Sequence, residues 1–133
     1  FDTLYCNIYA DREIAAIAVN EDRILLSRDR ELLKYREISH GCYVHAQKPN
    51  LQFREIIDRL ALGRSARPFT RCLECNAPLR EIDKSAVLDR LPPSVKMLRN
   101  RFWTCAICGR VFWEGTHWRS MKERVDEALR KAI

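Results

Sequence analysis

The sequence contains Cys72-Leu-Glu-Cys75-Asn76 and, further on, Cys105-Ala-Ile-Cys108-Gly109. Each C-x-x-C pair lets one tight turn present two thiolates to an ion, and two such turns complete a tetrahedron of ligands. Gly109 suits the positive φ of such a turn, and Asn76, in the matching position, also tolerates it. The pairs are separated by 29 residues, and this arrangement predicts one zinc ribbon ligated by Cys72, Cys75, Cys105 and Cys108.

The predicted zinc is structural, because four thiolate ligands leave no open position for water or substrate. The alternative is that the four cysteines are buried or redox-active thiols. Of the six cysteines in the chain, the other two, Cys6 and Cys42, stand alone in apolar surroundings. Nothing in the sequence indicates secretion, so metal binding is favoured over a disulfide scaffold.

The net charge of +6 is unevenly distributed along the chain. Residues 1–63 hold 9 Lys and Arg against 10 Asp and Glu, whereas residues 64–133 hold 15 against 8. A basic surface favours polyanions through phosphate contacts and counterion release, although such charge also serves solubility alone. Alternating basic and aromatic residues suit phosphate contact and base stacking.

The predicted nucleic-acid contacts are Arg28, Arg30, Arg71, Arg101, Arg110, Trp113, His117, Trp118 and Arg119. For Trp103 and Phe112 we favour a place in the small core of the ribbon.

Residues 1–63 alternate between strand and helix patterns. Strands are expected at 3–8, 23–27 and 42–45, and helices at 11–19, 29–35 and 50–62. Gly63 is expected to end the last helix as its C-cap. This order predicts a small parallel sheet covered by helices, hence an α/β fold class.

Residues 64–70 form a linker to the ribbon, which extends from Arg71 to about Trp113. Residues 83–90 predict a short helix that stops at Pro92-Pro93, and residues 118–133 predict a final helix. We therefore expect two domains: an α/β domain at 1–63, and a zinc ribbon with a C-terminal helix at 64–133.

The location of the protein follows from two absences in the sequence. No apolar run reaches the roughly 20 residues that span a bilayer, and no basic-then-apolar leader opens the chain. We therefore expect a soluble, cytoplasmic protein without membrane association.

The chain begins with Phe1-Asp-Thr-Leu-Tyr5, without Met and within an apolar run. We therefore expect an upstream segment, or a partner, to complete the sheet.

Acidic residues lie where helices of the first half are expected to begin: Asp11, Glu13, Asp29 and Glu31. In a parallel sheet, helix starts follow the C-terminal ends of strands, the edge where α/β active sites form. Carboxylates gathered there can hold magnesium or manganese ions that position water for attack on phosphate. The alternative is that the aspartates are N-caps and that the glutamates stabilise the helix dipole.

Two further stretches resemble a known family. The segment Arg23-Ile-Leu-Leu-Ser-Arg-Asp29 resembles the signature of PIN-like ribonuclease domains, in which a strand ends in Thr/Ser-Arg-Asp. The segment Phe112-Trp-Glu-Gly-Thr-His-Trp118 resembles the ribbon tail of the Mut-seven C-terminal RNase domain family, in which a four-cysteine ribbon follows a PIN-like domain. The likeness covers nearly the whole chain.

This resemblance implies a metal-dependent ribonuclease. Asp11 matches the acidic residue that opens the helix before the signature strand, Glu13 belongs to the same acidic cluster, and Asp29 matches the signature Asp. Ser27 stands where Thr is commoner. The first strand of such domains, which carries a principal metal-binding Asp, has no counterpart in this chain, and neither does the helix after it. The resemblance therefore implies that this chain by itself is catalytically incomplete.

The sequence as a whole predicts a PIN-like endoribonuclease that depends on magnesium or manganese and holds RNA with help from its basic zinc ribbon. The second hypothesis is a non-catalytic RNA-binding module, with the ribosome or tRNA as its partner. The third is a protein-interaction ribbon in which Trp113 and Trp118 pack on a partner.

Overall fold

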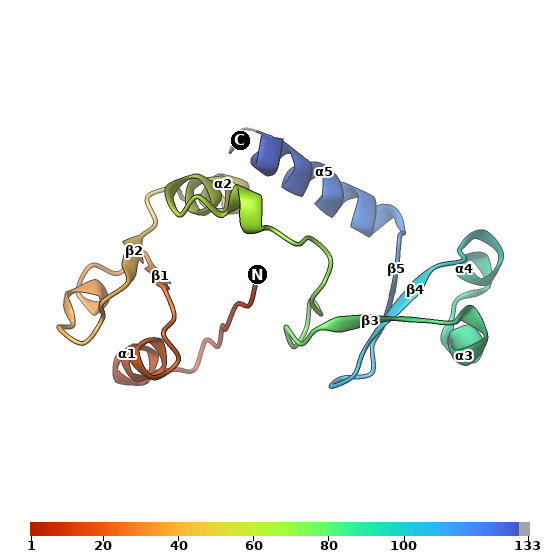
Figure 1. Ribbon diagram of the computed structural model, residues 1–133, viewed down its shortest axis with the longest axis horizontal. Coiled ribbons are helices and arrows are strands. Elements are labelled where there is room, and N and C mark those ends of the chain that lie inside the picture. Colours follow the sequence, from red (N-terminus) through yellow and green to blue (C-terminus); the bar gives the residue numbers. More distant parts are fainter. Residues whose placement is uncertain (131–133) are drawn as a thin grey trace. The chain divides into compact units, whose positions relative to one another are not determined.

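The computed structural model describes residues 1–130. Its backbone contacts divide the chain into two compact units: Tyr5–Leu62, and Phe1–Leu4 together with Gly63–Ile133 (Figure 1). The assignment of independent domains at 1–63 and 64–133 stays a prediction. Every helix in the described part of the chain is too short or too polar to span a membrane.

The unit Tyr5–Leu62 is built around a two-stranded parallel sheet. Strand β1 (Leu25–Ser27) pairs with β2 (Gly41–Tyr43), and Leu26 lies opposite Cys42. Helix α1 (Asp11–Asn20) precedes β1, the 3₁₀ turn η1 (Leu32–Lys34) lies between the strands, and α2 (Pro49–Arg59) follows β2. The predicted small parallel sheet of an α/β fold is therefore confirmed.

Two predictions in this unit, the strand at 3–8 and the helix at 29–35, are wrong. In both segments the apolar pattern is present, but the hydrogen bonds of the predicted element are not formed or do not continue. Residues 3–8 form no strand, and within the described chain they have no strand to pair with; Tyr5 and Ile8 are 84% and 83% exposed. Residues 29–35 hold only η1, because the chain returns to extended backbone at Tyr35, where ψ is 124°.

The end of α2 also differs from the expectation. The helix stops at Arg59, and the left-handed residue that follows is Ala61, with φ of +51°. Gly63 instead lies inside a second 3₁₀ turn, η2 (Leu62–Ser65). Gly63 therefore lies close to the end of the helix, as predicted, but it is not the C-cap residue.

The second unit contains a three-stranded antiparallel sheet. Its strands are β3 (Leu79–Ile82), β4 (Phe102–Cys105) and β5 (Val111–Trp113), with β4 in the centre. Between β3 and β4 the chain forms α3 (Lys84–Val87), η3 (Leu88–Arg90) and α4 (Pro93–Leu98). Helix α5 (Thr116–Arg130) follows β5.

The helical predictions for this unit hold in part. The short helix predicted at 83–90 is present as α3 and η3, and it stops before Pro92-Pro93 as expected. Pro93 also begins α4, a helix that was not predicted. Proline suits the first position of a helix as well as a helix stop, so the Pro92-Pro93 pair was interpreted only as a stop. Helix α5 begins two residues earlier than predicted, and its predicted end at 131–133 lies outside the described residues.

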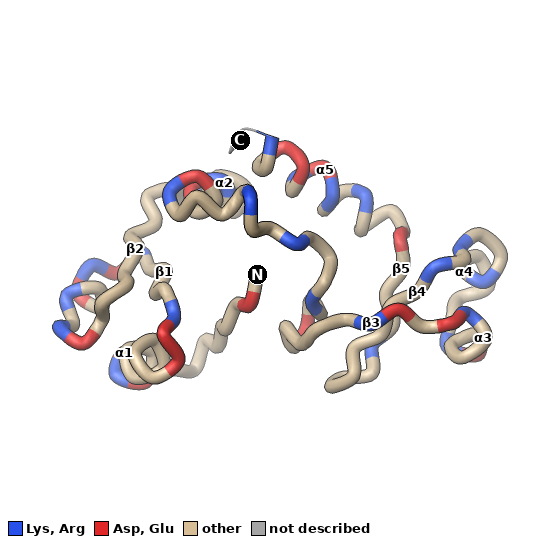
Figure 2. Tube along the Cα trace, viewed as in Figure 1, with Lys and Arg blue, Asp and Glu red and all other residues tan. Residues whose placement is uncertain are grey.

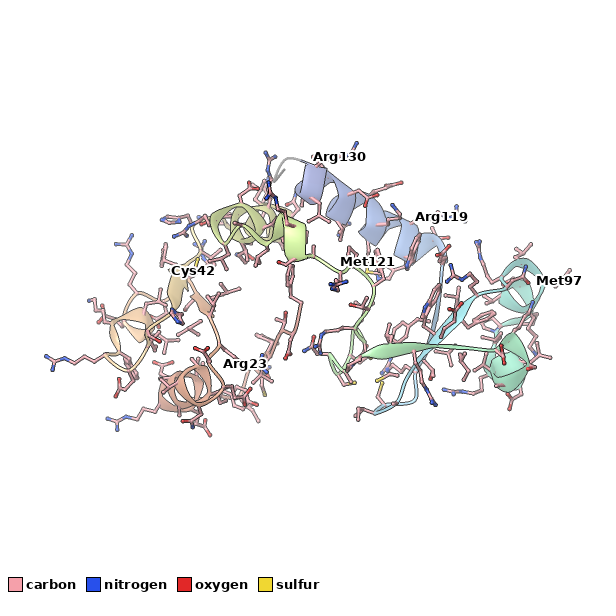
Figure 3. All side chains as sticks on the ribbon, in the orientation of Figure 1. Arg23, Cys42, Met97, Arg119, Met121 and Arg130 are labelled. Atoms are coloured by element: carbon pink, nitrogen blue, oxygen red, sulfur yellow. The ribbon has the colours of Figure 1, made fainter. Side chains whose placement is uncertain are left out.

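The core of this unit is small and apolar. Val87 and Leu91 pack against Phe102, which is fully buried at the start of the central strand β4, and partly buried apolar side chains surround them: Ile82, Val95, Val111 and Trp113. Met97 lies on the outer side of α4, away from this cluster (Figure 3), and is 84% exposed. The helical insertion between β3 and β4 therefore supplies one wall of the core.

We predict that Phe102→Ala lowers the free energy of unfolding by about 3–5 kcal/mol, because it leaves a cavity where the largest core side chain was. Chemical denaturation of the metal-loaded protein measures this change. The control, Met97→Ala, is expected to change the free energy by about 0.5 kcal/mol or less. Similar small effects of both substitutions would contradict the assignment of the core.

Candidate metal centre and nucleic-acid surface

The two C-x-x-C motifs form matching turns. In each turn, the residue after the second cysteine donates its N–H to the carbonyl of the first cysteine: Asn76 to Cys72 at 3.0 Å, and Gly109 to Cys105 at 2.9 Å. Asn76 and Gly109 have φ of +62° and +71°. Both positive φ values agree with the sequence-based expectation, and they aim the two sulfurs of each turn in one direction.

These turns bring the four predicted ligands together. The Sγ atoms of Cys72, Cys75, Cys105 and Cys108 all lie within 4.8 Å of one another. The shortest contacts join Cys75 to Cys105 at 3.3 Å and Cys72 to Cys108 at 3.6 Å. A Zn–S bond of about 2.3 Å gives a tetrahedron with edges of about 3.8 Å. The four cysteines are therefore positioned to bind one metal ion, and the all-sulfur set fits a structural zinc.

The electrostatics of the cluster also favour a cation. The N–H of Cys108, followed by that of Ile107, lowers the pKa of Cys105 to about 6, although burial opposes the shift. At Cys75 the N–H of Ala77 acts in the same direction, but the neighbouring Cys105 thiol and burial outweigh it and raise the pKa of Cys75 to about 11. The thiols cannot all ionise side by side, and a divalent ion removes that conflict.

Two arginines hold the turns from outside. Arg71 donates to the carbonyl of Asn76 at 2.8 Å, and Arg90 donates to the carbonyl of Gly109 at 2.6 Å. Each guanidinium therefore binds the residue that takes the positive φ. Arg71 was predicted as a nucleic-acid contact, and its observed contact is structural. Arg90 was missed, because its position in the helical insertion gives no sign of a contact with the second turn.

The other two predicted ribbon arginines lie in surface ion pairs. Arg101 lies 3.0 Å from Glu81, and Arg110 lies 3.4 Å from Glu74. All four side chains are exposed, so solvent screens the pairs and phosphate groups can compete for the guanidinium groups.

Strand register decides which aromatic side chains of the ribbon are buried. Phe102 lies opposite Trp113, and Trp103 lies opposite Phe112. Because side chains alternate across a strand, the first pair belongs to the core side and the second to the other face. Trp103 and Phe112 were predicted to lie in the small core of the ribbon. Only Phe102 of these four is fully buried; Trp113 is partly buried and packs against the core cluster, whereas Trp103 and Phe112 are partly buried outside that cluster.

The open face of the sheet combines aromatic and basic groups. The guanidinium carbon of Arg101 lies 5.1 Å from the centroid of the Trp103 ring. Phe112 lies beside Trp103 on the neighbouring strand. This is the combination that stacks bases and contacts phosphate.

The remaining predicted contacts of the ribbon lie at the start of α5. Trp118 packs on Phe69, with ring centroids 4.9 Å apart. His117 and Arg119 are exposed. Basic and acidic segments alternate along α5 (Figure 2), so the helix itself does not form a uniformly positive surface. The nucleic-acid roles of these residues stay predictions.

Asp11 and Glu13 occupy the first turn of α1. The N-cap is Ala10 rather than Asp11, and the Ala10 N–H donates to Oε2 of Glu13 at 2.7 Å. Glu13 therefore acts as a capping residue. Asp11 is exposed, and within residues 1–130 its carboxylate takes part in no hydrogen bond or ion pair.

Asp29 follows β1 and shapes the turn that leads to η1. Its Oδ1 accepts the N–H groups of Glu31 at 2.8 Å and Leu32 at 3.4 Å. Its own N–H donates to the Ser27 hydroxyl at 2.9 Å. In the part of the chain that the structure describes, the four cysteines form the only group of three or more side chains placed to share an ion. The metal-binding role of the carboxylates therefore stays a prediction.

Arg28 and Arg30, on either side of Asp29, have different surroundings. The Nη1 of Arg28 lies 2.7 Å from the carbonyl of His45 and 2.5 Å from that of Ala46, so this guanidinium fastens the segment after β2. Arg30 instead stacks on the ring of Tyr43. Of the two predicted contacts, Arg28 has a structural role and Arg30 leaves N–H groups for a ligand.

We predict that the purified protein holds one zinc ion per chain and that Cys105→Ser releases it. Loss of one thiolate leaves an incomplete tetrahedral ligand set, so zinc binds more weakly. Because zinc binding is coupled to folding, loss of the ion also destabilises the ribbon. Elemental analysis measures the zinc, and a thermal melt measures the fold. The control, Cys6→Ser, changes a cysteine outside the cluster and is expected to retain the metal. Full zinc occupancy in Cys105→Ser would contradict the proposed ligand set.

Comparison with known proteins identifies the family. A family model described as the Mut7-C RNAse domain matches residues 1–125, a range that contains all four cysteines together with Asp11, Glu13 and Asp29. No curated protein and no solved structure matches the chain. The match covers nearly all of the sequence, and the protein therefore belongs to the Mut7-C RNAse domain family.

Proposed function

We propose that this protein is a metal-dependent endoribonuclease whose zinc ribbon helps to hold the RNA. The family match over residues 1–125 carries this proposal, because it joins the unit that contains Asp11 and Asp29 with the four-cysteine ribbon in one RNase domain.

The proposed site for the catalytic ion uses Asp11 and Asp29. Both observed side-chain bonds of Asp29 go to Oδ1, and Asp11 takes part in none within residues 1–130. Each aspartate can therefore offer at least one oxygen. Magnesium usually keeps several waters and takes one or two carboxylates together with the substrate phosphate, so two protein ligands suit it. Glu13 is engaged at the helix start and supports the site from there.

Chain order supports this pairing. Asp11 begins α1, and Asp29 follows the C-terminal end of β1, the strand after that helix. In α/β folds, ligands bind outside the carboxyl ends of parallel strands. A bound magnesium or manganese ion would stabilise charge on the phosphate and acidify a water molecule.

The ribbon serves as the RNA-holding part in this proposal. Arg101, Trp103 and Phe112 share the open face of the sheet, and the unit carries the basic excess of the chain. The zinc fixes this face and takes no part in the reaction, because its four sulfur ligands leave no free position.

We predict that, in the full-length protein, Asp29→Asn lowers magnesium- or manganese-dependent cleavage of single-stranded RNA by about 100-fold or more, because an amide cannot replace the charge of a carboxylate ligand. The amide oxygen can still accept the N–H of Glu31, so the fold is expected to persist, with an unchanged melting temperature. Gel analysis of labelled RNA measures the cleavage.

The matched control for this experiment is Asp58→Asn, which removes the same charge from an exposed position on α2 of the same unit. It is expected to cleave RNA as the original protein does. Undiminished cleavage by Asp29→Asn would remove Asp29 from the catalytic site.

The second candidate function is a non-catalytic RNA-binding protein, with ribosomal RNA or tRNA among the ligands to compare. It is favoured by the absence of a three-carboxylate group within residues 1–130 and by the basic excess of residues 64–133. RNA binding that weakens with salt, without cleavage in either metal, would distinguish this function from the first.

We predict that Arg101→Ala weakens RNA binding and reduces the slope of log affinity against log salt by about 1, because one phosphate contact is lost. Fluorescence anisotropy at several salt concentrations measures both. The control is Glu81→Gln, which removes the ion-pair partner but leaves the guanidinium, and which is expected to bind RNA at least as tightly. A salt slope unaltered by Arg101→Ala would exclude Arg101 from the RNA surface.

A further inference from the structure

A shallow pocket lies between η1 and the end of β2, within the unit Tyr5–Leu62. Its volume is about 340 Å³, and it is lined by Arg30, Leu33, Lys34, Tyr43 and His45. Three of these five side chains carry basic nitrogen atoms, and none is a carboxylate. The lining therefore suits an anionic ligand that also has an apolar or aromatic surface.

Arg30 is presented to this pocket by Tyr43. The guanidinium carbon lies 5.1 Å from the centroid of the Tyr43 ring. Within residues 1–130, the guanidinium of Arg30 forms no ion pair with a carboxylate. Stacking occupies the flat face of a guanidinium and leaves its N–H edge free, and this edge binds two oxygens of a phosphate group.

His45 is oriented by Glu55. Its Nδ1 lies 2.8 Å from Oε1 of Glu55, and its ring meets that of Tyr43 edge to face, with centroids 4.9 Å apart. The N–H groups of His45 and Ala46, with help from the His45 ring and Arg59, hold the pKa of Glu55 at about 2, although burial opposes the shift. Glu55 is therefore an acceptor at neutral pH, so Nδ1 carries the hydrogen and Nε2 is left for a ligand.

Lys34 completes the basic side of the pocket. Its Nζ lies 2.6 Å from Oε1 of Glu31, and both side chains are largely exposed, at 68% and 77%. An exposed pair of this kind is worth little energy, so a phosphate group can attract the ammonium group with small loss.

We propose that this pocket binds the phosphate group of a nucleotide, with the base or ribose against Tyr43. Arg30 and Lys34 supply the charge for the phosphate group, whereas Nε2 of His45, which is an acceptor when Nδ1 carries the hydrogen, can accept a hydrogen bond from a ribose hydroxyl. The assignment of RNA as the source of that phosphate rests on the proposed function, whereas the phosphate chemistry rests on the lining alone. Arg30 directly follows Asp29 in the chain, so the pocket is suited to hold a nucleotide of a bound RNA strand.

The test uses the full chain with a short single-stranded RNA in buffer without added magnesium or manganese, so that the proposed metal-dependent cleavage does not consume the RNA. We expect Arg30→Ala and Lys34→Ala each to weaken binding about 5-fold or more, as the loss of a charged phosphate contact does. The matched control is Arg36→Ala, which removes the same charge from an exposed position two residues beyond Lys34 and outside the pocket lining. It is expected to stay within about 2-fold of the original affinity. An equal effect of Arg30→Ala and Arg36→Ala would overturn the pocket as a specific site.

A second measurement separates the two sources of phosphate. A nucleoside 5′-monophosphate is added while the ring resonances of His45 are followed by NMR. Shifts of these resonances that disappear in Arg30→Ala support the pocket. Shifts with the monophosphate but unchanged RNA binding in both pocket variants overturn RNA as the ligand and assign a free nucleotide. The absence of shifts with either ligand overturns the proposal. Loss of metal-dependent cleavage has no bearing on these readouts, so a failure of the proposed nuclease function is distinguishable from a failure of the pocket.

Discussion

Repulsion among four sulfur atoms is the constraint on which the second unit depends. The Sγ atoms lie within 4.8 Å of one another, and the low pKa of Cys105 stands against the high pKa of Cys75. Without a cation, repulsion between neighbouring thiolates disfavours ionisation of all four thiols. A bound cation removes this repulsion and links the two cysteine turns, which β3 and the helical insertion separate along the chain. Because the core around Phe102 is small, this closure supplies order that apolar burial alone does not provide in so short a segment.

The first unit is organised differently, by charged groups that bind backbone. Arg28 donates to the carbonyls of residues 44–46, and Glu55 accepts the N–H groups of His45 and Ala46. Gln52 adds a bond to the carbonyl of Ala46 at 3.0 Å. The segment after β2 is therefore held from both sides by polar contacts. This support fixes the rings of Tyr43 and His45, and it explains how a shallow pocket at the surface keeps a defined shape.

Much of this organisation could be predicted from local sequence patterns. The cysteine spacing gave the ligand set, the glycine and asparagine after each pair gave the turn conformation, and apolar periodicity gave α1, α2 and α5. The errors have a common origin in contacts between residues distant in sequence. Residues 3–8 have a strand-like pattern, but a strand requires a neighbour. From sequence alone, Trp103 and Phe112 are as plausible in the core as Phe102. The helical insertion covers the face of the sheet that carries Phe102, and this choice of face depends on tertiary packing. The contacts of Arg28 and Arg90 with backbone carbonyl groups also depend on tertiary structure, and no local sequence motif predicts them.

The second cysteine turn is also the loop of the hairpin between β4 and β5. Its residues 106–110 connect Cys105 to Val111, and the carbonyl of Arg110 accepts the N–H of Cys105 at 3.0 Å. Two independent requirements therefore fix the length of this loop: the positions of the two cysteine ligands and the register of β4 with β5. Inserting or deleting a single residue there would exchange the aromatic side chains on the core side of the sheet with those on its other face, and it would displace a ligand. The loop should consequently be among the least length-tolerant segments of the chain, although it lies at the surface, where loops ordinarily vary most.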